Sequence, residues 1–290
     1  MKEHILVIDG NNLLHRSYHG LKQSGLTTIH GDPIWAIHGF FVSLSRLMSI
    51  TNPKKIIIAL DSLNSCSERR KIMPEYKINR LEKSGSLLYE INLLPLVLDA
   101  CNITHVSINN READDIIASI AKISIMKDYK CYIFSSDRDM IQIIKDDVYV
   151  VDSKYNILDA NKIYEKYGLN PKQYYEMAAI RGEPGDNIKG VAGVGEKSAV
   201  NYLKKYGSLE SIFNLDPSII EGDKKINKVI SDKEKIVTNL SVSKLYEDLP
   251  MLGYFNNSEI VDNLEFEYLR NLGLKKAYQD ITQAYNNLKK

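Results

Sequence analysis

Short runs of apolar, mostly β-branched residues recur along the first half of the chain. They cover residues 5–8, 56–60, 103–108, 131–134 and 148–151. Between these runs, apolar residues return at helical spacing, as at Ile116, Ile117, Ile120 and Ile123. Strands that alternate with helices are typical of an α/β protein. The pattern therefore predicts a mainly parallel central sheet with helices on both faces.

The pattern changes near residue 160, where the strand signal fades and short helical segments follow one another between glycines. We expect an α/β core over residues 1–160 and a mainly helical part over 161–290. No internal repeat or low-complexity linker separates them, so the two parts should pack as one unit. Residues 62–86 have few apolar side chains and carry six cations against three acids, which predicts a long, exposed, basic arch.

Composition narrows the class of protein. The 290 residues contain no apolar stretch long enough for a membrane span, and the amino terminus does not resemble a signal peptide. The three cysteines are widely spaced and lack metal-site or disulfide spacing. We therefore expect a soluble cytoplasmic protein. With 38 basic and 37 acidic residues, the net charge of +1 does not by itself favour a nucleic-acid partner, so the distribution of charge must decide.

Acidic residues follow four of the predicted strands. Asp9 and Asp61 come directly after the first two, and further acids come after the third and fourth, namely Glu112, Asp114, Asp115, Asp137 and Asp139. In a parallel sheet, the space beyond the carboxyl ends of the strands is where ligands bind. The placement therefore predicts that these acids converge on one crevice although they are far apart in sequence.

Each acid also has a simpler structural interpretation. Asp-Gly-Asn is a good turn, and acids in the first turn of a helix cap its free amides. Several carboxylates in one crevice, however, repel one another unless cations neutralise them. All-oxygen ligation suits Mg²⁺ or Mn²⁺, and this many acids fits two ions with outer ligands. Two such ions are suited to phosphodiester hydrolysis.

A glycine-rich turn, GVAGVG over residues 190–195, opens a predicted helix. Glycines let a backbone approach phosphate closely, and free amides at a helix start bind it. The candidate DNA-binding residues here are Lys189, Gly190, Gly193, Gly195, Lys197, Lys204 and Lys205. A tight connection between two helices explains the glycines equally well.

Six stretches, in order, resemble the 5′-nuclease or flap endonuclease family. They are IDGNNLLHRSY, IIIALD, RRKIMPEYKINR, READDIIASIA, FSSDRDMIQII and RGEPGDNIKGVAGVGEKSA. The family includes the amino-terminal domain of bacterial DNA polymerase I and free-standing bacterial and phage enzymes. The resemblance implies a helix-three-turn-helix element around residues 183–206 that binds duplex DNA, with K⁺ held there by backbone carbonyls in some members.

The resemblance also implies roles for individual residues. Metal ligands match Asp9, Asp61, Glu112, Asp114, Asp115, Asp137, Asp139 and Asp186, and a ninth falls on Glu183, where the family usually has Asp. Arg16, Arg69, Lys77 and Arg80 match residues near the scissile phosphate, and Tyr76 matches a residue that stacks on a base. Glu68 departs from the pattern, because relatives commonly have an aromatic residue there.

Together these features predict a monomeric, metal-dependent 5′-3′ exonuclease or flap endonuclease that acts on DNA with 5′ flaps, 5′ overhangs or nicks during replication or repair. Because the chain ends at Lys290, no polymerase segment is expected to follow. One alternative is a paralogue that binds branched DNA but has lost catalysis, although all nine ligand positions are acidic. Another is an RNA-cleaving nuclease of a related fold. The preferred metal, protein partners and the role of residues 247–290 are left open.

Overall fold

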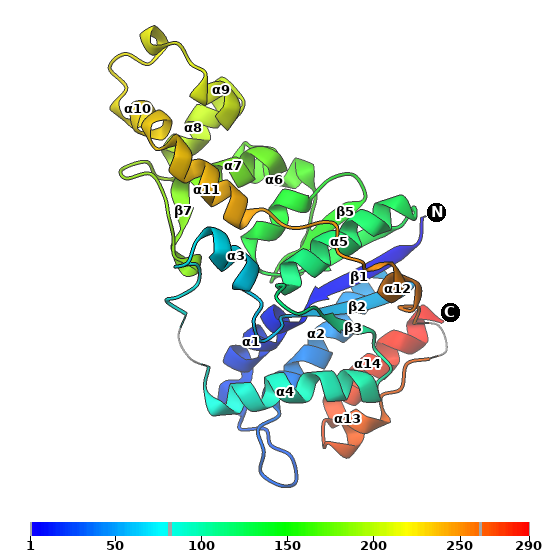
Figure 1. Ribbon diagram of the computed structural model, residues 1–290. Coiled ribbons are helices and arrows are strands. Elements are labelled where there is room, and N and C mark those ends of the chain that lie inside the picture. The colour runs from blue at the N-terminus through cyan, green and yellow to red at the C-terminus, as the bar shows by residue number, and fades with distance from the viewer. Residues whose placement is uncertain (1, 81–82, 261–262, 290) are drawn as a thin grey trace.

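A six-stranded sheet forms the centre of the computed structural model, which describes residues 2–80, 83–260 and 263–289 (Figure 1). Its order is β3-β2-β1-β4-β5-β6, and every pairing is parallel except β5 with β6. The strands are β1 (His4–Asp9), β2 (Lys55–Leu60), β3 (His105–Ser107), β4 (Lys130–Phe134), β5 (Val148–Val151) and β6 (Ile157–Leu158). The predicted fold class is confirmed.

Fourteen α-helices are assigned among the described residues. They are α1 (Gly10–Leu21), α2 (Trp35–Thr51), α3 (Ser67–Ile72), α4 (Gly85–Ala100), α5 (Ala113–Met126), α6 (Ala160–Tyr167), α7 (Pro171–Arg181), α8 (Glu196–Tyr206), α9 (Leu209–Phe213), α10 (Lys224–Ser231), α11 (Lys233–Ser243), α12 (Leu252–Asn256), α13 (Glu267–Asn271) and α14 (Lys275–Leu288). Short 3-10 helices are η1 (Lys22–Ser24), η2 (Arg138–Ile143), η3 (Pro184–Asp186) and η4 (Pro217–Ile219), and a small hairpin pairs β7 (Gly182–Glu183) with β8 (Ile188–Lys189).

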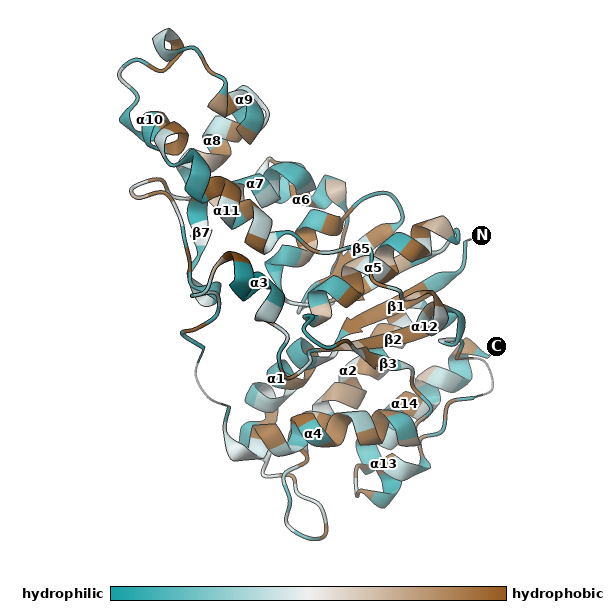
Figure 2. Ribbon diagram, in the orientation of Figure 1, coloured by the Kyte–Doolittle hydropathy of each residue, from teal (hydrophilic) through white to brown (hydrophobic). Residues whose placement is uncertain are grey.

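Both faces of the sheet are buried, as the continuous apolar runs predict. Along β1, Ile5 and Val7 join the core that contains α5, whereas Leu6 and Ile8 join the core that contains α2. All four side chains are fully buried. The strands accordingly form the most hydrophobic band of the molecule (Figure 2).

The third strand is shorter than predicted. Ile103 does not enter the ladder, because its N–H donates to the carbonyl oxygen of Leu98 at 2.9 Å and so closes the end of α4. At the other end, the carbonyl oxygen of Ile108 accepts from the N–H of Arg111 in a turn. Both ends of the apolar run are therefore used to connect helices to the sheet.

Gly10 lets α1 start directly behind β1. A Cβ atom at this position would lie 2.6 Å from Cδ2 of Leu60 and 3.0 Å from the carbonyl oxygen of Ala59 on the neighbouring strand. Such contacts are well inside van der Waals distance, so only glycine fits without a shift. The close approach of α1 to β2 places the end of β1 at the edge of the crevice.

The helical part continues the core of the α5 face. Buried side chains of α7, α8 and α11 join the same cluster as Ile5 and Val7. The last helix, α14, instead packs against α2 on the other face, with Ala277 and Ile281 fully buried. The chain therefore crosses back to the α/β core after α11, and the proposed division at residue 160 stays a prediction.

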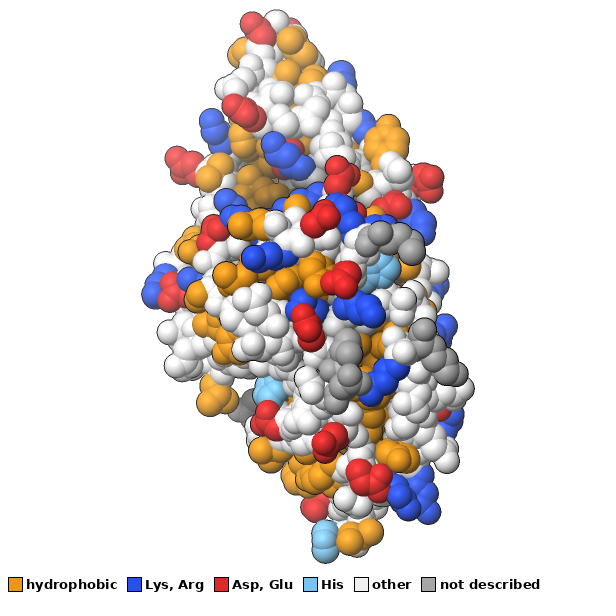
Figure 3. Space-filling view, turned by 90° about the vertical axis from the view of Figure 1, so that its right-hand side faces the viewer, with side chains coloured by type: hydrophobic (Ala, Val, Ile, Leu, Met, Phe, Trp, Pro, Cys, Tyr) orange, Lys and Arg blue, Asp and Glu red, His pale blue; other side chains and the backbone are white. Residues whose placement is uncertain are grey.

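The surface in Figure 3 shows basic and acidic side chains interspersed, which fits the balanced total charge. No helix among the described residues is long and apolar enough to cross a membrane.

Candidate active site

A cavity of about 490 Å³ opens beyond the carboxyl ends of the strands. Its acidic lining residues are Asp9, Asp61, Glu112, Asp114 and Asp137, and its basic ones are Lys77, Arg80 and Lys83. Five of the predicted carboxylates, from four separate segments, thus meet at one place, with cations from the predicted arch beside them.

Asp9 is almost buried at the centre of this arrangement. Its Oδ1 atom accepts from the N–H of Asn12 at 2.9 Å and caps α1, while Oδ2 accepts from the hydroxyl of Ser135 at 3.0 Å. Burial, with repulsion from Asp61 and Asp137, raises the pKa of Asp9 to about 7. Asp9 therefore caps a helix, where the sequence suggested a turn, but neither structural role accounts for the crowding of charge.

Asp61 joins the end of β2 to the start of α5. Its Oδ1 atom accepts from the N–H of Ala113 at 2.9 Å, and its own N–H donates to Oδ1 of Asn11 at 2.8 Å. The first turn of α5, which carries Asp114, is thereby fixed against the strand ends. Because β1 and β2 are parallel neighbours in register, Asp9 and Asp61 face the same cavity.

The acids after β3 and β4 repel one another. Burial, then the charges of Asp137 and Asp9, raises the pKa of Asp114 well above its usual range. Burial, then the charges of Asp137 and Asp186, raises the pKa of Asp139 to about 8. Such shifts are typical of carboxylates that share a site without enough positive charge.

Lys77 and Arg80 supply positive charge to this cluster. The Lys77 ammonium lies 2.5 Å from Oε1 of Glu112 and 3.6 Å from Oδ2 of Asp186. Arg80 donates from Nη2 to Oδ1 of Asp186 at 2.9 Å, and about half of its side chain is exposed. Asp186, which only the family resemblance suggested, therefore lies beside the strand-end acids.

The predicted arch is less exposed than its composition indicates. Arg69, Tyr76 and Lys77 are only 8%, 4% and 5% exposed. The Tyr76 hydroxyl donates to Oε2 of Glu112 at 3.2 Å, and its ring lies in a small core with Val242. The ring of Tyr76 is therefore covered by the protein in this structure, and its stacking on a base stays a prediction. The segment lies inward because the acids Glu112 and Asp186 bond it there.

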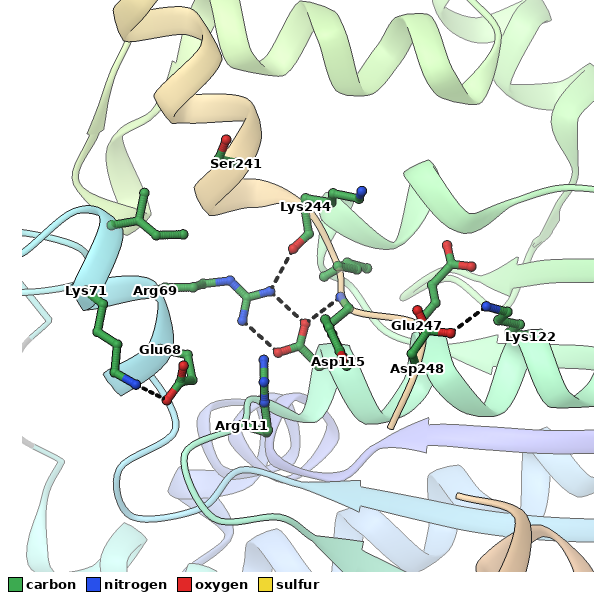
Figure 4. Close-up of a pocket in the computed structure, with 13 residues that line it drawn as sticks. Glu68, Arg69, Lys71, Arg111, Asp115, Lys122, Ser241, Lys244, Glu247 and Asp248 are labelled. Carbon is green, nitrogen blue, oxygen red and sulfur yellow. Dashed lines mark hydrogen bonds and ion pairs between the residues drawn. The ribbon is translucent and has the colours of Figure 1, made fainter. Parts of the chain in front are cut away.

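Asp139 and Asp186 do not line the 490 Å³ cavity but lie near acids or cations that do, and three further predicted residues also lie outside it. Glu183 pairs with Arg181 at 2.5 Å, and its side chain is 39% exposed. Arg16 donates from Nη2 to the carbonyl oxygen of Ser153 and packs over Tyr155, and its buried Nη1 atom has no hydrogen-bond partner among the described residues. Asp115 lies behind Glu112, in the wall of a second cavity of about 600 Å³ (Figure 4). Their predicted roles stay predictions.

The backbone at the glycine turn lies close to the end of α7, as a tight connection between helices requires, and its approach to phosphate stays a prediction. A Cβ atom on Gly190 would lie 1.9 Å from the carbonyl oxygen of Arg181, and Gly193 adopts a positive φ of 79°. Gly195 precedes α8. Lys189 and Lys197 are exposed near the turn, whereas Lys204 and Lys205 lie at the far end of α8 and do not join them.

Sequence reasoning missed several residues at both places. Asn11, Asn12 and His15 line the main cavity, and the first two follow Asp9 so closely in IDGNN that the motif could have suggested them. Near the glycine turn, Lys228 of α10 reaches the carbonyl oxygen of Ala192 at 3.4 Å. No local signal in the sequence links α10 to that turn.

The carboxylates surround a space rather than a point. As the side chains stand, no group of three or more His, Cys, Asp or Glu residues in the described part of the chain is arranged to hold a metal ion directly. The donors that line the cavity are nevertheless carboxylate and amide oxygens, the set that Mg²⁺ and Mn²⁺ prefer. The chemistry of the donors fits such an ion, and an ion that keeps several waters needs few direct contacts.

Comparisons with known proteins agree with this geometry. Residues 4–168 match the family model described as "5′-3′ exonuclease, N-terminal resolvase-like domain", and residues 169–262 match "5′-3′ exonuclease, C-terminal SAM fold". The 5′-3′ exonuclease of Buchnera aphidicola is 37% identical over 215 residues, which cover 73% of this chain and 74% of that protein.

Two further proteins are similar over most of the chain. The thermostable DNA polymerase I of Thermus thermophilus is 32% identical over 251 residues, or 86% of this chain, but the match spans only 30% of the polymerase. The flap endonuclease of bacteriophage T5, solved in a pseudo-enzyme-product complex with DNA and metal ions, shares the fold with a TM-score of 0.71 at 21% identity, over 98% of this chain and 100% of the phage chain.

Proposed function

The chain belongs to the 5′-3′ exonuclease family, and we propose that it is a divalent-metal-dependent 5′-nuclease that hydrolyses DNA phosphodiester bonds near junctions of single strand and duplex. Its substrates would be 5′ flaps, 5′ overhangs and nicks that arise in replication or repair. The T5 relative of the same fold, a flap endonuclease solved with DNA, supports this substrate class.

One observation carries the proposal. Acids from the ends of β1, β2 and β4 and from the start of α5 line a single cavity, and the cations of residues 77–83 line it too. Fold stability gains nothing from such crowding, since burial and mutual repulsion raise the pKa values of Asp9, Asp114 and Asp139. A site that binds divalent cations through its carboxylates and a phosphodiester through its cations explains why acidic and basic residues line the same cavity.

We assign the metal-holding role to carboxylates of the cluster around this cavity. They are Asp9, Asp61, Glu112, Asp114, Asp137, Asp139 and Asp186, with Glu183 as the eighth. Divalent ions bound there, most simply two Mg²⁺ or Mn²⁺ ions, would supply an activated water and stabilise the leaving oxygen. Asn11 and Ser135 hold this set in place, because they bond the backbone of Asp61 and the side chain of Asp9.

The cations of the arch would hold the phosphate of the substrate. Arg80 is suited to this role, because its guanidinium is half exposed at the cavity and forks toward anions. Lys83 lines the same wall. Lys77 is buried against Glu112, and this ion pair keeps the arch close to the carboxylates. A phosphate could approach the Lys77 ammonium only from the cavity.

Duplex DNA would lie against the glycine turn before α8. The exposed Lys189 and Lys197 flank this turn, and Lys228 approaches it from α10. Contacts of this kind bind phosphates and do not distinguish bases. We therefore expect recognition of shape and of the 5′ end rather than of sequence, and K⁺ held by backbone carbonyls of the turn would add positive charge.

A 5′-labelled flap substrate tests the proposal. With Mg²⁺ or Mn²⁺ the chain should cut near the junction, and with chelator it should not. Asp114→Asn and Asp137→Asn should each reduce cleavage by at least about 100-fold, about 3 kcal/mol in transition-state stabilisation. The matched control is Asp128→Asn, at an exposed position with a positive φ that asparagine accepts. No metal-dependent cleavage, together with tight binding of the flap, would instead identify a binding protein.

A flap of the same sequence made of RNA distinguishes the remaining alternative. Faster cleavage of the RNA flap than of the DNA flap would contradict the proposed substrate class. Equal binding of blunt duplex and flap would contradict recognition of the junction.

A further inference from the structure

Every N–H group of Arg69 is bonded inside the protein. Nε donates to the carbonyl oxygen of Val242 at 2.9 Å, Nη1 donates to Glu112 and Asp115 at 2.8 and 2.9 Å, and Nη2 donates to Asp115 and to the carbonyl oxygen of Lys244 at 2.8 and 3.2 Å. A guanidinium has five donors, so none remains for a substrate phosphate. Arg69 is only 8% exposed, and its guanidinium links other parts of the protein to α3.

Asp115 is equally occupied. Both of its oxygens accept from Arg69, and Oδ1 also accepts from the N–H of Tyr246 at 2.9 Å. The residue is 1% exposed and faces the 600 Å³ cavity beside α3, not the carboxylate cavity (Figure 4). If Asp115 turned to a metal ion, it would leave a buried guanidinium without its main partner, which is costly.

This pair joins three segments that are distant in sequence. Arg69 lies on α3, Asp115 on α5, and Val242 to Tyr246 form the end of α11 and the segment after it. One turn earlier on α11, the Asn239 amide donates to the carbonyl oxygens of Ala179, near the end of α7, and of Lys189, in β8. The carboxyl-terminal half of α11 is thus bonded to the region of the glycine turn through Asn239 and, one turn later, to Arg69 through Val242.

Helix α3 is also connected to the carboxylate cavity. Arg70, next to Arg69 on α3, donates from Nε to the carbonyl oxygen of Tyr76 at 3.0 Å. The N–H of Lys77 then donates to the carbonyl oxygen of Asp186 at 3.0 Å. The position of α3 therefore determines where the ammonium of Lys77 stands relative to the carboxylates.

We propose that Arg69 and Asp115 are positioning residues, not a phosphate contact and a metal ligand. Together they clamp α3 to α5 and to the end of α11, and so hold Lys77 and Arg80 at the carboxylate cavity when duplex lies on the helical part. The proposal rests on the proposed function for its catalytic consequence, but the clamp itself is a property of the free chain.

Three measurements on the full chain test the clamp, with Asp115→Asn and the charge-conserving Arg69→Lys as variants. Asp114→Asn serves as the ligand variant. Asp248→Asn is the matched control, because Asp248 lies in the same segment after α11 but pairs with Lys122 at the surface. Titration with Mn²⁺, followed by electron paramagnetic resonance without DNA, should give affinities within threefold of the parent for Asp115→Asn and at least tenfold weaker for Asp114→Asn.

Hydrogen exchange should then be at least tenfold faster in residues 66–78 and 242–248 of both clamp variants, and unchanged in Asp248→Asn. With the flap substrate, at a temperature well below the melting point of each variant, kcat should fall at least tenfold. The dissociation constant for the flap in Ca²⁺ should change less than threefold. A merely structural role would lower the melting temperature and leave kcat unaltered.

Each contrary result has a distinct meaning. Loss of Mn²⁺ affinity in Asp115→Asn that equals the loss in Asp114→Asn would make Asp115 a ligand and overturn the proposal. Unchanged exchange would show that no clamp exists, and faster exchange with normal kcat would overturn the positioning role. A parent chain that does not cut the flap overturns the proposed function, and the exchange result alone then decides whether the clamp exists.

Discussion

The Lys77 ammonium lies 2.5 Å from the Glu112 carboxylate, and the two side chains are only 4% and 5% exposed. A buried pair of this kind is costly to form but still more costly to break, because the remaining charge loses its partner. The pair therefore links the stability of the fold to the geometry of the cavity.

Replacing Lys77 by a side chain of similar length without charge should destabilise the protein. We expect Lys77→Met to lower the free energy of unfolding by about 3 kcal/mol. Lys71→Met is the control, since Lys71 forms an exposed pair with Glu68, and it should cost less than about 0.5 kcal/mol. Urea denaturation in the presence of chelator measures both, and equal losses would contradict a buried ion pair in the folded protein.

Divalent metal should stabilise the folded chain, because binding to the carboxylate cavity requires the folded arrangement. At a free concentration 100 times the dissociation constant, Mg²⁺ should add about 2.7 kcal/mol to the free energy of unfolding. The increase should be much smaller in Asp114→Asn and undiminished in Asp128→Asn. Thermal melts with Mg²⁺ or chelator give the comparison, and the same increase in Asp114→Asn would place the ions elsewhere.

Gly190 should not tolerate a methyl group. A Cβ there would meet the carbonyl oxygen of Arg181 at 1.9 Å, so Gly190→Ala must displace the backbone of the turn. We expect a loss of about 3 kcal/mol in the free energy of unfolding and at least tenfold weaker binding of duplex DNA. Gly253→Ala, in α12, should be neutral or stabilising by up to about 1 kcal/mol, because the new Cβ would meet nothing beyond its own helix within 4 Å in the described part of the chain. Normal duplex binding by Gly190→Ala would remove the turn from the DNA interface.

Glu90 should make stability depend on pH away from the cavity. It is fully buried, and its Oε2 accepts from the N–H of Ile37 at 2.8 Å. Burial raises its pKa from 4.5 to about 6, so the folded chain holds this proton more tightly than the unfolded chain does. Protonated Glu90 therefore contributes its full share to the free energy of unfolding below about pH 4.5, and this contribution is lost as the pH rises through about 6.

The corresponding variant is Glu90→Gln. It should be more stable than the parent by about 1 kcal/mol at pH 8 and show no such gain at pH 4. Glu221→Gln, at an exposed position, controls for the change in net charge. Denaturation at the two pH values measures the difference, and a gain confined to pH 4 would reverse the assigned direction of the shift.

The strand-end acids were predictable because a parallel sheet brings its carboxyl ends together whatever the loops do. Asp9 and Asp61 follow that rule directly, and Asp114 follows it through the start of α5. The burial of Tyr76 and Arg69 could not be predicted in the same way, because it depends on acids and carbonyls supplied by distant segments. From its composition alone, that region was predicted to be a solvent-exposed arch.

The return of α14 to the α2 face shows the same limit. Its helical spacing is visible in the sequence, but nothing local distinguishes a helix that covers the sheet from one that extends the preceding helices. Similarly, the small hairpin of β7 and β8 has two residues in each strand, too few to produce an alternating pattern. Such elements are defined by the partners they contact.

The packing of α14 against α2 also affects how the chain folds during its synthesis. Leu6 and Ile8 of the first strand share a buried cluster with Ala277 and Ile281, which are made only after every strand of the sheet. Until α14 has been made, α2 exposes the apolar side chains that α14 covers in the folded protein. The nascent chain then has an exposed hydrophobic surface that chaperones or other chains can bind. A premature stop before α14 would therefore yield a fragment that contains all the candidate active-site residues yet is prone to aggregate.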